Sequence, residues 1–522
     1  MPALPSAKRA VGAVRGGSSV GERVDGASLS PEGRAAETAR LERELSRLHA
    51  LVAAEAFEDR APLVGIEVEL DLIDEVGGPA PVAERVLAAL HRDAPGLDAQ
   101  HELARYNLEL NLPPRPLAAG LLDALERDLA RGLAEVAAAA DGIAAPIAIG
   151  ILPTIGTGEA GVEVLSGGDR YRLLDEAVRG GRAHLPITIE GPAATGGERL
   201  ELSLPSIALE AAATSLQVHL DAPIARLAAT LDAAQAITPA LVAVAANSPL
   251  LCGSALWHET RVPLFEQVID LRDAAGIARG DRPRVWFGER WHEHAIDAFD
   301  ENVRHFPPLL PQREPEDDPV PGGAGPAPAL AALRLHNGTV WRWNRPVYAV
   351  VDGRPTLRLE HRALPAGPTP IDMVANVALL VGAVSAIASG SAEDLLGGRL
   401  EERLAFADVE AGFRTAARDG LDAALVWPGL DGADAARVVL EVLVPAAERG
   451  LADAGLSTTE RDRLLDVVAA RAATRRTGSA WQLRMLRRLE DSMDRDRALG
   501  RLTRRYLELQ GEGSPVHTWP TT

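Results

Sequence analysis

The fold is decided by the stretch Leu63-Val64-Gly65-Ile66-Glu67-Val68-Glu69-Leu70-Asp71-Leu72, in which apolar and polar side chains alternate without a break. A period of two predicts a β-strand with one buried face and one polar face. The polar face carries three carboxylates, and side chains two residues apart on a strand lie roughly 6.5–7 Å apart. Like charges at that spacing repel, so we expect either positive charge or full solvation to accompany this strand.

Three further stretches show the same alternation, each with a metal-binding residue type on its polar side. They are residues 106–112, which contain Glu109, residues 215–221, which contain His219, and residues 356–362, which contain Glu360. The prolines at positions 113 and 114 are expected to end the first of them, because proline lacks the N–H that a strand ladder needs. Four such strands predict a sheet with one polar face.

The rest of the chain reads mainly as helix. Apolar periodicity predicts helices at residues 36–56, 81–92, 117–141 and 224–246, and a short strand at 146–152. Residues 371–510 are nearly all helical in pattern and include one long charged helix from Trp481 to Leu509. The pattern predicts an α+β fold, in which a curved, mainly antiparallel sheet forms a funnel-shaped site on one face and is packed by helices on the other.

Composition divides the chain into three parts. Residues 1–34 are rich in Ala, Gly, Ser and Pro and are expected to be a disordered tail. Residues 35–390 are expected to form the domain that contains the site, with a flexible insertion rich in Pro and Gly at 311–328. Residues 391–522 are expected to be a helical C-terminal region packed on that domain.

Charge and cysteine content narrow the class of protein. Lys plus Arg is 54 and Asp plus Glu is 74, so the formal charge is −20, which argues against a nucleic-acid-binding surface. Cys252 is the only cysteine, which excludes an internal disulfide and a Cys-rich zinc site. No apolar run reaches the ~20 residues of a membrane span, and the N-terminus lacks a signal-peptide core. We therefore expect a cytoplasmic protein that acts on small molecules; the sequence does not indicate its oligomeric state.

The polar faces of the four strands offer a set of metal ligands: Glu67, Glu69, Glu109, His219 and Glu360. Each group alone has an ordinary structural interpretation, because a Glu-x-Glu pair can be a solvated face and a single histidine can be hydrogen-bonded in a core. Glu360 and Arg362, two residues apart, can also form a salt bridge. Ligands rich in oxygen, borne on rigid strands, favour Mg²⁺, and one imidazole makes Mn²⁺ acceptable.

In this order the segments resemble the glutamate–cysteine ligase family, and through it a glutamine-synthetase-like catalytic fold. The resemblance is carried by Gly65-Ile66-Glu67-Val68-Glu69, Gln217-Val218-His219, Asn247-Ser248-Pro249, Trp343-Asn344-Arg345-Pro346, Leu359-Glu360-His361-Arg362 and Thr369-Pro370-Ile371-Asp372. It covers about residues 60–390. Asn344-Arg345 departs from the family's Asp-x-Arg by one position.

The resemblance implies an ATP-dependent ligation of a carboxylate, in the family that of glutamate, to an amine, in the family that of cysteine, through an acyl phosphate. It implies that Glu67, His219 and Glu360 hold one metal ion, and that Glu69 and Glu109, with Glu102 seven residues before, hold another. It implies that Arg345 and Arg362 bind phosphate and act in catalysis, and that Arg261 also binds the nucleotide.

Two alternatives remain open from the residues. One is a ligase or phosphotransferase that acts on a different carboxylate and amine, because a fold hosts many substrates. The other is a relative that binds nucleotide or metal without catalysis.

A further expectation is that Glu67→Ala and Glu360→Ala abolish turnover with little loss of folding, because each relieves the crowding of carboxylates.

Overall fold

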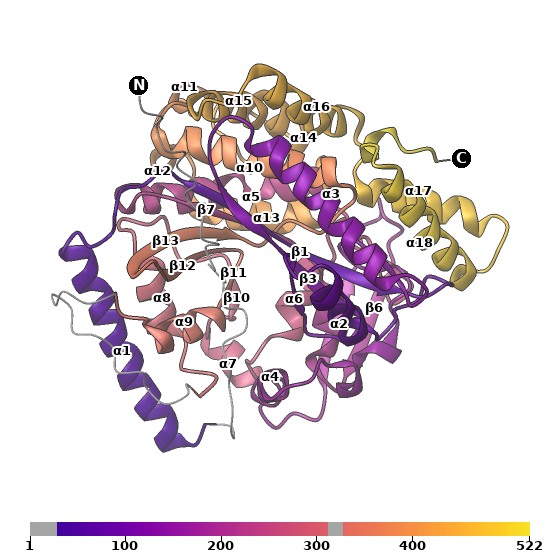
Figure 1. Cartoon of the computed structure of the whole chain (residues 1–522), viewed down its shortest axis with the longest axis horizontal. Helices are drawn as coiled ribbons and strands as arrows, with labels where there is room; N and C mark the ends of the chain where they lie inside the picture. Colours follow the sequence, from indigo (N-terminus) through magenta and orange to yellow (C-terminus); the bar gives the residue numbers. More distant parts are fainter. Residues whose placement is uncertain (1–28, 312–326, 522) are drawn as a thin grey trace, which may run out of the picture.

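The computed structural model describes residues 29–311 and 327–521. At its centre lies one curved antiparallel sheet, in which the strand order is β12-β13-β7-β1-β3-β2 and β4 also pairs with β1 (Figure 1). The strands are β1 (Leu63–Ile73), β2 (Asp98–His101), β3 (Asn107–Pro116), β4 (Ala145–Ile147), β7 (Leu216–Asp221), β12 (Asn344–Val351) and β13 (Arg354–His361). The predicted α+β class and the antiparallel sheet are therefore confirmed.

β1 lies in the middle of this sheet, between β3 and β7, and both of its faces are covered. Its apolar side is fully buried, as the alternation predicts, from Val64 at 0% exposure to Leu72 at 0%. The polar side is not a solvated face, because Glu67 is 3% exposed and Asp71 is 0% exposed. Asn107 donates a hydrogen bond to Asp71, which accounts for one of the three carboxylates of the strand.

The expectation that two prolines end the second strand is wrong, because β3 continues to Pro116. The register between β1 and β3 shifts between Val64 and Ile66, opposite the prolines, so the ladder is irregular there. On the other side β2 pairs only as far as Asn111, which leaves the prolines on an open edge. An open edge beside an irregular register needs no N–H from either proline.

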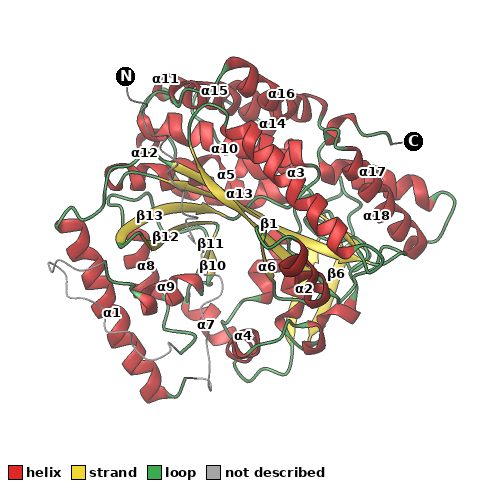
Figure 2. Ribbon diagram, viewed as in Figure 1, coloured by secondary structure: helices red, strands yellow, loops and turns green. Residues whose placement is uncertain are grey.

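Three long helices pack on the outer face of the sheet: α3 (Leu121–Ala140), α5 (Leu227–Ala245) and α10 (Pro370–Ser389) (Figure 2). The segments Ile224–Ala245 and Pro370–Ser389 are as long and apolar as membrane spans, which the sequence expectation of no such run did not anticipate. In their most apolar windows, 89% and 83% of the residues are buried inside the molecule. They therefore pack as core helices.

Further elements surround the sheet, and α2 among them packs against α3. They are α1 (Pro31–Ala53), α2 (Ala83–Asp93), α4 (Asp169–Arg179), α6 (Arg261–Val268), α7 (Ala274–Arg279), α8 (Asp297–His305), α9 (Ala331–Gly338), the hairpin of β5 (Leu185–Glu190) and β6 (Arg199–Leu204), and the pairs β8 (Leu250–Leu251) with β9 (Ser254–Ala255) and β10 (Val285–Trp286) with β11 (Trp341–Arg342). A 3₁₀ helix, η3 (Ile207–Ala212), precedes β7.

The C-terminal part is helical, as predicted. Its helices are α11 (Glu393–Leu396), α12 (Leu400–Arg403), α13 (Phe406–Asp419), α14 (Ala435–Val438), α15 (Val444–Asp453), α16 (Thr458–Thr474), α17 (Gly478–Glu490) and α18 (Arg495–Glu512). The expected single helix from Trp481 to Leu509 is wrong, because it is divided between α17 and α18. Asp494 caps the second of these helices by accepting a hydrogen bond from the N–H of Arg497.

Several predicted boundaries need correction or lie outside the described residues. Helix α1 begins at Pro31, inside the segment 1–34 that was expected to be a tail, and residues 1–28 of that segment are outside the described residues. Residues 312–326 of the expected insertion are also outside them. The strand expected at 146–152 is limited to Ala145–Ile147, because only three residues pair with β1.

Candidate active site

The register of the sheet brings the predicted ligands together. Glu360 of β13 lies opposite His219 of β7, and His219 lies opposite Gly65 of β1. Glu69 of β1 lies opposite Glu109 of β3. Directly opposed residues in an antiparallel pair have Cβ atoms about 4.5–5.5 Å apart, so these side chains share one face and one neighbourhood. Residues from positions 67 to 360 of the chain thus converge at the inner face of one sheet.

The first group of ligands, called cluster 1, consists of Glu67, His219 and Glu360. One potential ligand atom from each lies within 4.8 Å of the others. The Nε2 atom of His219 is 2.9 Å from Oε1 of Glu67. All three side chains are buried, with exposures of 3%, 7% and 2%. Burial penalises each anion of this set, so a positive charge beside it stabilises its ionised form.

The second group, called cluster 2, consists of Glu69, Glu102 and Glu109, whose ligand atoms also lie within 4.8 Å of one another. Burial, and after it the charge of Glu69, raises the pKa of Glu102 to about 7. Burial, and after it the charges of Glu67, Glu102 and Glu69, raises the pKa of Glu109 well above its usual value. The three carboxyl groups of cluster 2 resist being ionised at the same time. A divalent cation among them would stabilise their ionised forms, so they form a suitable site for one.

Hydrogen bonds from β7 and from the residue before it fix the orientation of Glu69. The backbone N–H of Ser215 donates to Oε2 at 2.6 Å, and its hydroxyl donates to Oε1 at 2.9 Å. Gln217 Nε2 donates to the same Oε1 at 3.1 Å. The Asn111 amide donates to Glu109 at 3.0 Å. These ligands are therefore held in place before any ion binds, which suits a preorganised site.

Two predicted arginines lie beside cluster 1. Arg345 Nε is 2.6 Å from Oε2 of Glu360, and Arg362 Nη1 is 3.4 Å from the same oxygen. Although burial alone would raise the pKa of Glu360, Arg345 and Arg362 hold it well below its usual range. Arg362 also donates to Gln217 Oε1 at 2.5 Å. The two arginines thus favour the ionised form of Glu360.

The one-position departure at Asn344-Arg345 leaves the arginine on the correct face. Asn344 pairs with His361 and points into the helical layer, where its amide donates to Gln235 at 2.8 Å and to Thr238 at 3.0 Å. Arg345 pairs with Glu360 and faces the site. Strand alternation therefore separates a core residue from a site residue within one motif.

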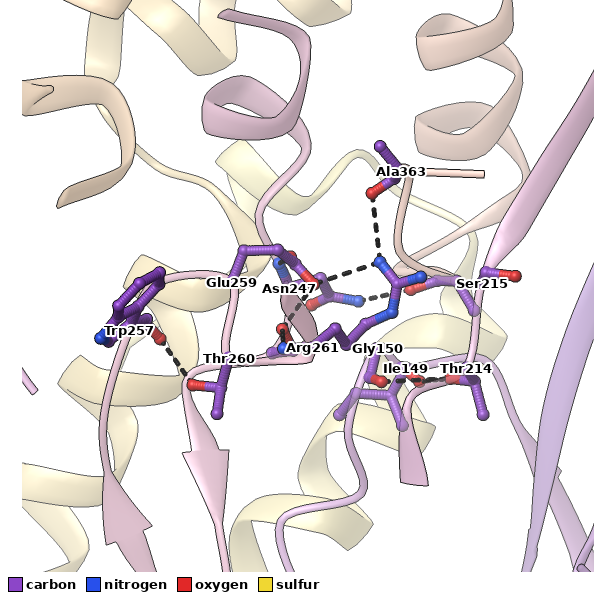
Figure 3. Close-up of polar contacts among 12 residues, drawn as sticks. Ile149, Gly150, Thr214, Ser215, Asn247, Trp257, Glu259, Thr260, Arg261 and Ala363 are labelled. Carbon is purple, nitrogen blue, oxygen red and sulfur yellow. Dashed lines mark hydrogen bonds and ion pairs between the residues drawn. The ribbon is translucent and has the colours of Figure 1, made fainter. Parts of the chain in front are cut away.

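Arg261, the third predicted arginine, stands at the start of α6 and is 3% exposed (Figure 3). Its Nη1 lies 3.3 Å from Oε1 of Glu259 and donates to the carbonyl of Ala363 at 3.2 Å. Glu259 also accepts a hydrogen bond from the hydroxyl of Ser248 at 2.5 Å and one from the N–H of Asn247 at 3.0 Å. The Nε of Arg261 is buried and has no hydrogen-bond partner among the described residues.

Two adjoining cavities meet at the clusters. The larger has a volume of about 1230 Å³, part of it open to solvent, and is lined by aromatic and basic side chains, among them Tyr348, Trp341 and Arg345, together with Glu360. The smaller has a volume of about 520 Å³, also partly open to solvent, and is lined by Arg261, Phe265 and Trp343. Glu69, Glu102, Glu210 and Arg362 line both cavities. Glu69 and Glu102 of cluster 2 therefore stand at the boundary with Arg362, where groups held in the two cavities would meet.

Sequence reasoning missed two residues of this site. Glu210 lines both cavities, but it lies in Ile207–Ala212, whose short helical pattern gives no functional signal. Arg358 lines the larger cavity, and its Nε donates a hydrogen bond to Nδ1 of His219 at 3.1 Å. Its place on the same strand as Glu360, two residues away, is the signal that could have found it.

The residues of both clusters fit divalent cations. They offer five carboxylates and one imidazole, a donor set that is hard and rich in oxygen. The raised pKa values in cluster 2 show that protein charges do not neutralise it. All six predicted metal-ligating residues are brought together, in the two groups that the sequence paired.

Comparison with known proteins assigns the class and the family. The chain is an ATP-dependent carbon–nitrogen ligase, of the kind that joins a carboxylate to an amine. It belongs to glutamate–cysteine ligase family 2 (GCS2), whose family model matches residues 63–505. No curated protein matches the chain.

Three solved structures are similar to the chain at low sequence identity. A glutamate–cysteine ligase from Francisella tularensis in complex with AMP is 11% identical with a TM-score of 0.46, and the match covers 90% of this chain and 91% of that one. A bifunctional glutathione synthetase from Pasteurella multocida is 12% identical with a TM-score of 0.46, covering 91% and 55%. The ligase PafA in complex with the prokaryotic ubiquitin-like protein Pup is 12% identical with a TM-score of 0.36, covering 85% and 71%.

Proposed function

We propose that this ligase joins the γ-carboxylate of glutamate to the amino group of cysteine, with ATP as the second substrate and Mg²⁺ as the metal. The observation that supports this proposal most is that Glu69 and Glu102 of cluster 2, together with Arg362, line both a large cavity and a small one. A nucleotide matches the aromatic and basic walls of the large cavity, and an amino acid matches the size and mixed charge of the small one. Mn²⁺ would also suit the imidazole of cluster 1.

In the proposed reaction a carboxylate oxygen attacks the terminal phosphorus of ATP, and the bond to the ADP oxygen breaks. The ammonium of the amine substrate first loses one proton, and the nitrogen lone pair then attacks the acyl carbon. The bond from that carbon to the phosphate oxygen breaks, phosphate leaves, and the nitrogen loses a second proton to solvent, which leaves the amide N–H. Glu67, His219 and Glu360 would hold one ion, and Glu69, Glu102 and Glu109 another. Divalent ions supply Lewis acidity and neutralise phosphate charge when bound.

The arginines have distinct proposed roles. Arg345 and Arg362 stay fixed beside Glu360, so their remaining N–H groups can bind phosphate oxygens as charge develops there. Arg261 lines only the smaller cavity, so we assign it to the amino-acid side of the site, in place of the nucleotide contact predicted from sequence. The proposal also places the reaction in the cytoplasm, where ATP is supplied.

One assay tests this function. ADP release is measured with Mg²⁺, ATP and glutamate across a panel of amines that includes cysteine, and the amide product is identified by mass spectrometry. Release that cysteine stimulates, with γ-glutamylcysteine as the product, supports the proposal. Stimulation by another pair of substrates would assign the same chemistry to a different acid or amine and would overturn the proposed specificity.

A further inference from the structure

Glu210 differs from the other carboxylates of the site. It lines both cavities but belongs to neither metal-ligand cluster of the described residues. Its carboxylate makes no hydrogen bond and no ion pair with any described residue, whereas Glu69 accepts three hydrogen bonds and Glu360 lies between two arginines. A half-buried carboxylate without a partner in a substrate cavity is suited to bind a cation that arrives with the substrate, because the cation favours its ionised form.

The position of Glu210 is fixed by the local chain. The helix η3 is capped by the hydroxyl of Ser206, which accepts a hydrogen bond from the N–H of Ala208 at 3.1 Å. The buried carboxylate of Asp175 accepts another from the N–H of Ile207 at 2.9 Å. Ala211 and Ala213, which also line the smaller cavity, are small and leave space beside the carboxylate. Glu210 is therefore presented on a rigid element toward an open volume.

Arg261 supplies a second, independent pointer to a ligand in the smaller cavity. Its side chain is 97% buried, lines this cavity and keeps one buried N–H without a partner among the described residues. The smaller cavity thus has the guanidinium of Arg261 on one wall and the carboxyl group of Glu210 on another. Phe265 and Trp343, whose ring centroids are 5.8 Å apart, add an apolar surface. This combination matches an α-amino acid with an uncharged side chain.

We propose that Glu210 binds the ammonium group of the amine substrate and thereby selects amines that arrive protonated. This inference rests on the proposed ligase function. The reacting end of the carboxylate substrate is an anion, so it requires the clusters and Arg362 and is repelled by Glu210. The reacting end of the amine substrate is a cation, and Glu210 is the carboxylate at the boundary that metal ligation leaves available.

The electrostatic environment supports a cationic ligand at this residue. Burial, and after it the charges of Glu102 and Glu69, raises the pKa of Glu210 to about 8. A positive charge beside the buried Glu210 carboxyl favours its ionised form. The attraction is stronger there than at an exposed carboxylate, because the local dielectric constant is low.

The test compares Glu210→Gln with wild type in two assays at the same Mg²⁺ and ATP concentrations. The first measures amide formation with L-cysteine, which is an ammonium at neutral pH. The second replaces the amine by hydroxylamine, a neutral nucleophile that traps an acyl phosphate as a hydroxamate. We expect Glu210→Gln to raise the KM for L-cysteine about tenfold or more, the loss of one charged contact, and to leave hydroxamate formation and the KM for ATP near wild type.

Controls separate this inference from folding and from the proposed function. Glu163→Gln removes an exposed carboxylate and should change neither assay. Glu210→Asp keeps the charge and should recover part of the lost affinity, and melting temperatures confirm that the variants fold. An unchanged KM for L-cysteine in Glu210→Gln, or a parallel loss of hydroxamate formation, would overturn the assignment. Absence of hydroxamate with the wild-type enzyme would instead overturn the proposed function.

Discussion

Glu360 and Glu109 are both buried carboxylates of the same sheet face, but their surroundings are opposite. Glu360 lies between two arginines, which keep its pKa well below the usual range despite burial. Glu109 has a pKa raised well above its usual value by burial and by neighbouring glutamates. A negative charge therefore stabilises the metal-free protein at Glu360 and destabilises it at Glu109.

This contrast predicts opposite effects of two matched variants in the presence of EDTA. Glu360→Gln should lower the free energy of unfolding by roughly 3–5 kcal/mol, because it leaves the buried guanidinium of Arg345 uncompensated. Glu109→Gln should leave stability unchanged or raise it, because it removes one of three crowded acids. Urea unfolding followed by circular dichroism measures both values. Equal losses in the two variants would contradict this electrostatic account.

The expectation that Glu360→Ala folds almost normally is accordingly revised. From sequence alone, all the strand carboxylates looked equally crowded, because pairing across strands depends on register. The register places Arg345 opposite Glu360 and Glu109 opposite Glu69. The residue types of the site were thus readable in the chain, but the sign of each electrostatic effect depended on which strands became neighbours.

At the scale of elements, the C-terminal helices are tied to the loops beneath Arg261. The hydroxyl of Tyr506 on α18 accepts a hydrogen bond from Asn247 at 2.8 Å and donates one to the carbonyl of Ala148 at 3.0 Å. Gln482 on α17 donates to the carbonyl of Asn247 at 3.0 Å. The backbone of Asn247 in turn bonds Glu259, the neighbour of Arg261. A helical region after the sheet therefore supports a wall of the site.

The Tyr506→Phe variant tests this support. Loss of both hydrogen bonds in a buried position should lower the free energy of unfolding by about 1–3 kcal/mol. It should also raise the KM for an amino-acid substrate while the KM for ATP stays constant. Arg501→Gln, an exposed change on the same helix, is the control for stability and for both KM values. If the two variants behave alike, the helix does not support the site.

The short helix α9 carries a buried histidine whose ionisation should affect stability. His336 is 4% exposed, and its Nε2 lies 2.8 Å from the carbonyl of Phe306. Burial, and after it the charge of Arg284, lowers the pKa of His336 from 6.5 to about 4. The unfolded chain therefore binds a proton at a higher pH than the folded chain does. The corresponding stability is fully present above pH 6.5 and is lost as the pH falls toward 4.

The size of this effect follows from the shift in pKa. A change from 6.5 to about 4 corresponds to roughly 3 kcal/mol of folding free energy lost across that pH window. His336→Gln should flatten the dependence of unfolding free energy on pH between 6.5 and 4. The control is His91→Gln, an exposed histidine on α2. An unchanged slope in His336→Gln would show that this histidine is not the group responsible.

Most elements were predictable because their patterns are local. The alternation of β1 and the apolar content of α5 and α10 predict a strand and two core helices directly. The incorrect predictions concern features that depend on neighbouring strands and on helix caps, which a local sequence pattern does not show. β3 runs through its prolines because its outer edge is open there, and the charged C-terminal helix breaks at a cap, Asp494, that resembles any other acidic residue.

At the scale of the molecule, the sheet gathers groups that lie about three hundred residues apart in the chain. The helices on one face leave the other face to carry two ligand clusters, several arginines and two cavities. This arrangement concentrates negative charge in a buried place.

Mg²⁺ should therefore raise the melting temperature of the protein, because it binds the folded state and neutralises the clusters. The increase should shrink in Glu67→Gln, which is measured by differential scanning fluorimetry against Glu163→Gln; an equal increase in both variants would contradict this.

The central claim is that the two clusters hold divalent cations where the cavities meet. Crystals grown with Mn²⁺ and a non-hydrolysable ATP analogue, with data collected at the manganese absorption edge, test it directly. We predict one anomalous peak among Glu67, His219 and Glu360 and a second among Glu69, Glu102 and Glu109, with the analogue's phosphates beside both. A bound analogue without anomalous density at either cluster would contradict the claim.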